Sequence, residues 1–306
     1  MKIPRLLLTS VMALALAGSA MAATFYESAL SLQGKTIDLG NAGRIYKWAA
    51  LSVAGNVSAS TSYNTSPANL DITGNVGVWG TSSQLVLTNS RIGQDLFIRQ
   101  GTGTESLTGS GGWNGAKFQN ASTDTILSTA AANVKTLSDN INALTKTTNF
   151  SMTGIDDTPS TLMRIATSGF AHNTTSTNLV IDGTANNPFN EPIVLKLADF
   201  VLNDIGGTQL TLIGTALTKF IINVSDTFSI ANSTDIVLSG GLLASNVIFN
   251  VRGTSGAGLS GGSTLQGILV AKNGTASLAG ASTVTGMVIG KAVTLTGGSK
   301  IQITSP

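Results

Sequence analysis

The C-terminal part of the chain repeats a short pattern of apolar and polar positions. Four apolar runs begin at Phe220, Val247, Ile268 and Met287, which are 27, 21 and 19 residues apart. Each run is followed by two further short stretches that pass through Gly, Asn, Ser or Thr. Repeats of about 20 residues with three short strands are typical of a solenoid whose coils stack on one another. The pattern predicts a mainly β protein, a three-sided parallel β-helix with regular coils over about 208–303.

The second and third strands of each repeat alternate between an apolar and a polar side, which is the period of a strand with one buried face. We expect the core to contain Ile230, Leu259, Leu278 and Leu295 from the second strands, and Ile236, Leu265, Val284 and Ile301 from the third. The outward positions are Ser229, Gly258, Ser277 and Thr294, and Asp235, Thr264, Thr283 and Lys300.

The first strands break this rule, because their outward side is apolar as well. The alignment of the four runs places Ile221, Ile248, Leu269 and Val288 in one outward column. A column of exposed aliphatic residues is unusual in a soluble monomer, so we expect another element to cover it.

Residues 122–147 supply the candidate cover. Apolar residues recur at helical spacing, and no Pro or Gly interrupts the segment. We predict a helix over about 124–146 with Thr123 or Asp124 as N-cap and Lys135, Asp139 and Lys146 on its polar side. Its length of roughly 36 Å would let it lie beside about seven coils. The apolar positions are Ile126, Ala130, Val134, Leu137, Ile141 and Leu144.

Other segments have strand patterns of the same kind but less regular ones. They are 51–60, 70–80 and 83–100 before the helix, and 178–183 and 192–197 after it. No linker divides the chain, so we treat 23–306 as one domain that the helix interrupts.

The first 22 residues predict export. Lys2 and Arg5 precede an apolar run, and Ala20-Met21-Ala22 provides small residues for cleavage after Ala22, as in a secretory signal peptide. The chain has 17 basic and 15 acidic residues, and the leader holds two of the basic ones. The mature chain would then have 15 of each sign, with no basic surface for nucleic acid and, without the leader, no membrane span.

The sequence from 246 to 291 resembles that of a known family. The order N-V-I-F-N-V, then G-I-L-V-A-K-N, then T-G-M-V-I-G-K resembles choice-of-anchor A domains of secreted bacterial surface proteins. More distantly, I-T-G-N-V-G-V at 72–78, the long helix and the Gly-rich repeats resemble bacterial and fungal ice-binding proteins. The resemblance implies an interrupted three-sided β-helix with the helix alongside. Choice-of-anchor proteins usually carry a C-terminal anchor, and we expect none after Ile303.

Residues with catalytic chemistry are sparse, and we predict no enzymatic activity, no cofactor and no metal site. His172 is the single histidine, and the chain has no cysteine. Asp156, Asp157 and Asp182 could belong to a carboxylate cluster of a polysaccharide-active enzyme, although adjacent aspartates before Thr-Pro more often form a turn. Among the tryptophans we assign Trp48 to the core and leave Trp79 and Trp113 open.

The outward hydroxyl groups provide the remaining candidate site, a surface able to order water or lie against a regular polymer. Our first hypothesis is a non-enzymatic extracellular adhesion or structural module, for which extracellular polysaccharide or cell-surface material is the partner. The alternatives are an ice-binding protein and a carbohydrate-binding or polysaccharide-active protein. Candidate positions for the binding face are Ser229, Ser277 and Thr294 in one column and Thr264, Thr283 and Thr285 in another.

Overall fold

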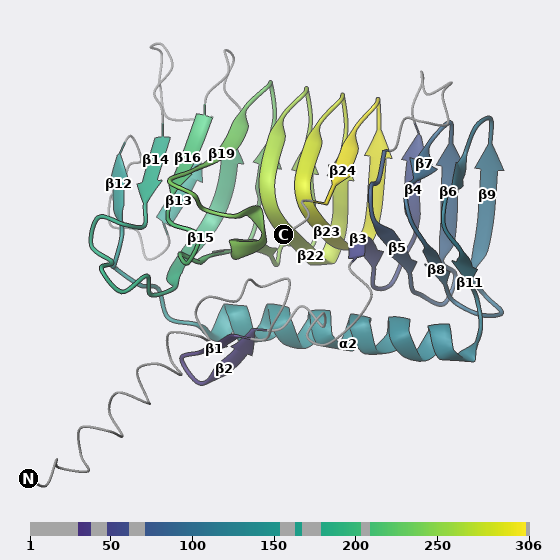
Figure 1. Ribbon diagram of the computed structural model, residues 1–306, viewed down its shortest axis with the longest axis horizontal. Coiled ribbons are helices and arrows are strands. Elements are labelled where there is room, and N and C mark those ends of the chain that lie inside the picture. The colour runs from purple at the N-terminus through teal and green to yellow at the C-terminus, as the bar shows by residue number, and fades with distance from the viewer. Residues whose placement is uncertain are drawn as a thin grey trace, which may run out of the picture.

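The computed structural model describes residues 30–37, 48–60, 71–153, 163–166, 179–202 and 209–303. These residues form a parallel β-helix with three sheets, and the helix α2 (Ala121–Ala143) runs along its length (Figure 1). The predicted fold class is confirmed. The leader at 1–22, together with His172, Asp156 and Asp157, lies outside the described residues.

The sheet under the helix, here called the covered sheet, continues through both halves of the chain. Neighbouring strands pair in parallel along the whole stack. In spatial order its strands are β15 (Ile193–Leu202), β17 (Phe220–Val224), β20 (Val247–Val251), the middle of β22 (Thr264–Leu278) and of β23 (Thr283–Thr296), β3 (Trp48–Ser52), β5 (Asn75–Val78), β8 (Leu96–Ile98) and β11 (Lys117–Phe118).

The second sheet, here called the Ser/Thr sheet, follows the same order of coils. It contains the C-terminal part of β15, β18 (Phe228–Ile230), β21 (Ala257–Leu259), the C-terminal parts of β22 and β23, β4 (Val57–Ser60), β6 (Gln84–Thr88) and β9 (Thr104–Thr108).

The third sheet, here called the mixed sheet, closes the triangle. It contains β14 (Leu179–Asp182), β16 (Gln209–Ile213), β19 (Asp235–Ser239), the N-terminal parts of β22 and β23, and β24 (Lys300–Gln302), and continues through Ile72 to β7 (Arg91–Ile92) and β10 (Gly112–Trp113). Short strands β12 (Ser151–Thr153) and β13 (Met163–Ala166) pair with β14 and β15.

The order of coils in space differs from their order along the chain. The coils nearest the N-terminus stack on the last coils, because β23 pairs with both β3 and β4. The chain then crosses the molecule through α2 and builds the opposite end of the stack from residues after the helix (Figure 1). The helix therefore connects the two ends of one continuous β-helix.

The core has the alternation that the sequence predicts. All eight of the expected inward residues of the second and third strands are buried, each with at most 1% of its surface exposed. Phe200 and Phe228 stack with ring centroids 5.0 Å apart, and Phe249 meets both edge-on at 5.7 Å. Trp48 is buried beneath the helix, as expected, where it contacts Phe97 edge-on.

The helix starts three residues earlier than the prediction. Asn120 is the N-cap, and its side-chain oxygen accepts a hydrogen bond from the backbone N–H of Thr123 at 2.9 Å. The predicted caps Thr123 and Asp124 lie inside the first turn, where the carboxylate of Asp124 suits the positive end of the helix dipole. At the other end Leu144 follows the last helical residue and is fully buried.

The predicted outward column of the covered sheet is correct for Ile221 and Ile248 and wrong for Leu269 and Val288. Leu269 and Val288 point into the core, while the residues just before them, Ile268 and Met287, face the helix. Ile248 pairs with Ile268 and not with Leu269, so the register is one residue away from the alignment of the apolar runs. Because side chains alternate, a shift of one residue moves each of them to the opposite face. The strand residues that pack under the helix include Val194, Ile221, Ile248, Ile268, Val270, Met287 and Ile289.

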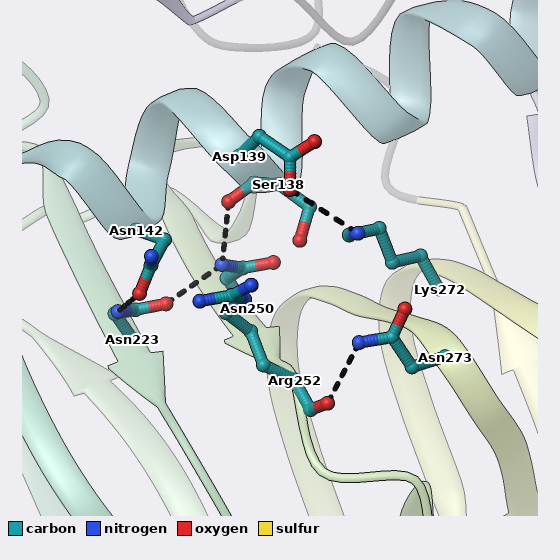
Figure 2. Close-up of polar contacts among 8 residues, drawn as sticks. All are labelled: Ser138, Asp139, Asn142, Asn223, Asn250, Arg252, Lys272 and Asn273. Carbon is teal, nitrogen blue, oxygen red and sulfur yellow. Dashed lines mark hydrogen bonds and ion pairs between the residues drawn. The ribbon is translucent and has the colours of Figure 1, made fainter.

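Part of the helix interface is polar. Asn223 and Asn250 are in register on neighbouring strands, and Asn250 Nδ2 donates to Asn223 Oδ1 at 2.7 Å and to the Ser138 carbonyl at 3.2 Å. Asn223 Nδ2 donates in turn to Asn142 Oδ1 at 3.3 Å (Figure 2). Lys196, in register with Asn223, reaches the Asn142 carbonyl at 3.0 Å. These bonds fix which turn of the helix lies over which coil.

Candidate functional site

One outward column on the Ser/Thr sheet runs through eight coils. Its residues are paired in register from one strand to the next, and all are small and uncharged. Ser229, Ser277 and Thr294, three of the sequence candidates, belong to it. The hydroxyl groups of Ser58 and Thr294 lie 3.4 Å apart across the junction of the two halves of the chain. The full column is Val201, Ser229, Gly258, Ser277, Thr294, Ser58, Val86 and Ser106.

A second column lies two residues further along the same strands. Thr296, Ser60, Thr88 and Thr108 are in register with one another, and three of the four are exposed. Stacked coils are about 4.8 Å apart, and residues i and i+2 on a strand are about 6.7 Å apart. The two columns therefore form a regular grid of hydroxyl and methyl groups, here called the Ser/Thr face.

Tight corners hold one edge of the Ser/Thr face in place. Ser263, Ser282 and Ser299 are fully buried, and each hydroxyl donates to the carbonyl three residues earlier, at 2.7, 2.7 and 2.8 Å. The two residues before each of these serines have positive φ, which favours glycine. Five of these six positions are glycine, and the sixth is Ala281. Identical corners keep successive coils in step, so the outward side chains of neighbouring coils stay aligned.

The other three sequence candidates lie on a different sheet. Thr264 and Thr283 are in register on the mixed sheet, and Thr285 follows two residues later. The same column contains Asp235 on one side of the two threonines and Lys300 on the other. Asp235 Oδ1 accepts hydrogen bonds from the Thr264 hydroxyl at 2.6 Å and from its backbone N–H at 3.0 Å. The six candidates therefore form two separate surfaces, and the one on the mixed sheet carries charge.

The N-terminal coils extend the Ser/Thr face in a way that the sequence analysis missed. Ser58, Ser60 and Thr88 come from segments that were expected to be strands but were not placed beside the C-terminal coils, and Ser106 lies on β9, a strand that was not predicted. The segments V-S-A-S at 57–60 and Q-L-V-L-T at 84–88 show the same alternation of inward and outward residues as the C-terminal strands, and this was the signal in the sequence. It could not reveal that these strands continue the same sheet, because nothing in the local pattern identifies the neighbouring coil.

Of the residues considered for catalysis, Asp182 lies in the described part of the chain. Asp182 ends β14, where its Oδ1 accepts bonds from the backbone N–H and hydroxyl of Thr184 at 2.8 and 2.7 Å, as in a turn. Within the described ranges no three His, Asp or Glu side chains are grouped so as to hold a metal ion. Burial lowers the pKa of Lys219, which precedes β17 at a corner away from the Ser/Thr face.

Trp79 and Trp113, which the sequence left open, are both half-buried. The Arg99 guanidinium lies 4.7 Å from the centre of the Trp79 ring, a cation–π contact beside the covered sheet. Trp113 is in register with Ile92 and packs against the core at the end of the stack. Neither belongs to the Ser/Thr face. No helix in the described residues combines the length and the apolar character that a membrane crossing requires.

Residues 201–301 match the Ice-binding-like family, which is less than half of the chain. This segment contains the C-terminal coils and the first five positions of the outward column that runs from Val201 to Ser106. No curated protein matches the chain.

Two solved structures of ice-binding proteins align with most of the chain. An ice-binding protein from the Antarctic ascomycete Antarctomyces psychrotrophicus is 20% identical and aligns with a TM-score of 0.50, covering 88% of this chain and 99% of its own. A glycosylated ice-binding protein from an Arctic yeast is 14% identical, with a TM-score of 0.49, and the alignment covers 85% and 91%. The chain is thus similar in its C-terminal sequence to the Ice-binding-like family and shares the fold of the ascomycete ice-binding protein.

Proposed function

We propose that the protein binds ice and that the Ser/Thr face is the surface that contacts it. The observation that carries the proposal is the continuous, uncharged double column of small residues across coils from both halves of the chain. The match of residues 201–301 to the Ice-binding-like family supports the same function. This replaces adhesion of the choice-of-anchor A type as the preferred hypothesis, since no comparison favours adhesion or a polysaccharide partner.

The chemistry of the face suits a crystalline surface of water. A charged side chain holds its own hydration shell strongly, and removing that shell is costly. Serine and threonine hydroxyls instead exchange hydrogen bonds with ordered water at little cost, and the methyl groups of Thr294 and Val86 leave neighbouring water without a competing partner. Because the grid repeats along both the strands and the stack, water held by one coil has the same arrangement at the next.

The mixed sheet lacks these properties, although it also contains threonines. Asp235 and Lys300 interrupt its column, and the Thr264 hydroxyl is already bonded to Asp235. An ordered layer of water would have to accommodate both charges. We therefore assign Thr264, Thr283 and Thr285 to the solvated outside of the β-helix and not to the binding surface.

The experiment compares ice with polymer binding for the purified protein. We expect faceted ice crystals, a measurable gap between melting and freezing temperatures, and inhibition of recrystallisation at micromolar protein. Heat-unfolded protein is the control, because the face exists only in the folded β-helix. Absence of all three effects, together with retention on cell-wall or exopolysaccharide beads, would return adhesion to first place.

We also propose that the protein acts outside the cell, on the basis of the leader at 1–22. Cleavage after Ala22 would give a mature N-terminus at Ala23. Intact-mass measurement of protein from the medium should give the mass of 23–306. An exported product that retains Met1 or Lys2 would contradict this prediction.

A further inference from the structure

The β-helix ends in a coil whose three strands each pair on one side only. Within the described residues β9 pairs with β6, β10 with β7, and β11 with β8, and no further coil lies beyond them. Strands at the edge of a sheet have backbone N–H and C=O groups directed away from their partner strand, and these can pair with another chain. A second copy of this protein has coils of the same three-stranded form and could therefore extend the stack here.

The inward positions of this last coil differ from those of every coil beneath it. Glu105 is in register with the buried Leu85, and Lys117 is in register with the buried Leu96. One strand further into the stack, Val57 is in register with Leu85 and Val76 is in register with Leu96, and both valines are fully buried. The terminal coil therefore has an acid and a base in two columns that are otherwise apolar.

These two charged side chains meet over the end of the core. Lys117 Nζ and Glu105 Oε1 form an ion pair, and the two side chains remain 31% and 30% exposed. They come from different sheets, β11 and β9, so the pair bridges the open end of the triangle. Trp113, from the mixed sheet, packs against the core at the same end of the stack. Leu107 occupies a further inward position and is 45% exposed.

Side chains also hold the terminal coil in place. Gln119 Nε2 donates to the carbonyls of Arg99 and Gly103 at 3.1 and 2.9 Å. Asp95 Oδ1 accepts from the backbone N–H of Ala116 at 2.8 Å, and the Arg91 guanidinium donates to Asn114 Oδ1 at 2.8 Å. The charged pair is thus carried on a fixed coil and not on a fraying end.

We propose that the Glu105–Lys117 pair is an end cap that prevents a second copy of the protein from stacking on β9, β10 and β11. A copy docked there would remove both charges from water, and a buried ion pair regains its desolvation cost only with excellent geometry. Apolar residues at the same positions would instead give the second copy a core to cover. The inference concerns assembly and does not depend on ice binding.

The test replaces the two charges with residues of the buried columns. In the double variant Glu105→Val/Lys117→Val we expect the molar mass from size-exclusion light scattering to at least double relative to the parent protein, with a dependence on concentration. The matched control is Thr104→Val/Ser106→Val, which adds two apolar residues to outward positions of the same strand and should leave the mass unchanged.

A third variant locates the contact. Adding Leu107→Asp to the double variant restores a charge at the same end and should return the mass to that of the parent. Assembly of the outward control as well, or persistence of the oligomer after Leu107→Asp, would overturn the proposal, as would an unchanged mass in a folded double variant. If the double variant does not fold by circular dichroism, Glu105→Gln/Lys117→Gln takes its place. It removes both charges at similar length and must show the same dependence on concentration.

Discussion

The covered sheet and the Ser/Thr sheet are built from the same coils but have opposite outer surfaces. β22 and β23 pass through both sheets, so a single strand contributes Ile268 or Met287 beneath the helix and Ser277 or Thr294 on the open side. Outward residues under the helix are mostly apolar, with hydrogen-bonded polar side chains such as Asn250 among them. Those on the Ser/Thr face are small and uncharged, and most carry a hydroxyl group. The comparison indicates that the type of residue at an outward position of a β-helix depends on whether another element or solvent covers that position.

The largest expected difference concerns a carboxylate placed on each sheet. Ile248→Asp puts an unpaired charge under the helix, at a position with no exposed surface, and should cost several kcal/mol, comparable to the whole stability of a domain. Ala130→Asp, on the helix side of the interface, should have a similar effect. Chemical denaturation measures both.

The matched control for this pair is on the open sheet. Ser277 is half-exposed, so Ser277→Asp should change the free energy of unfolding by no more than about 0.5 kcal/mol. It should nevertheless weaken ice binding, because it places a strongly hydrated charge on the Ser/Thr face. Equal denaturation midpoints for Ile248→Asp, Ser277→Asp and the parent would show that the helix does not cover Ile248.

A smaller effect is expected from the asparagine pair that links the covered sheet to the helix. Asn250→Val leaves the Asn223 side-chain oxygen and the Ser138 carbonyl without their donor, which should cost about 1–3 kcal/mol. The double variant Asn223→Val/Asn250→Val should cost less than the sum of the single variants, because two facing polar groups leave together. Strict additivity in this cycle would mean that the two side chains act independently.

The smallest effect is expected on the exposed side of the helix. Asp139 forms an ion pair with Lys272 at 3.2 Å, but its side chain is 48% exposed (Figure 2). Exposed pairs contribute little, so Asp139→Ala should lower stability by about 0.5 kcal/mol or less. A loss as large as that of Asn250→Val would place this ion pair among the contacts that hold the helix.

Much of this architecture is readable from the sequence. Strict alternation identified the inward residues Ile230, Leu259 and Leu278, and helical spacing identified the covering helix, since burial on one side imposes both periods. The register of the covered strands was not readable in the same way. The runs at Ile268 and Met287 are apolar on both faces, so aligning their first residues gives no indication of which face is inward.

The extent of the Ser/Thr face was also beyond the sequence. Thr294 and Ser58 lie in adjacent strands although they are far apart along the chain, and that contact depends on the first coils stacking on the last. Local patterns predict strands but not which strands meet. The division of the six threonine and serine candidates between two sheets also depends on which strands meet. Thr283 and Thr294 occupy one long strand that passes through all three sheets.

That single strand permits the most direct test of the central claim. Thr294→Tyr and Thr283→Tyr make the same substitution at two half-exposed threonines of β23, one on the Ser/Thr face and one on the mixed sheet. The measurement is the gap between melting and freezing temperatures at equal protein concentration. We predict that Thr294→Tyr reduces it by about tenfold or more, since a protruding ring disrupts a flat contact, whereas Thr283→Tyr leaves it within about twofold of the parent. Loss of activity in Thr283→Tyr with full activity in Thr294→Tyr would contradict the assignment of the ice-binding surface to the Ser/Thr face.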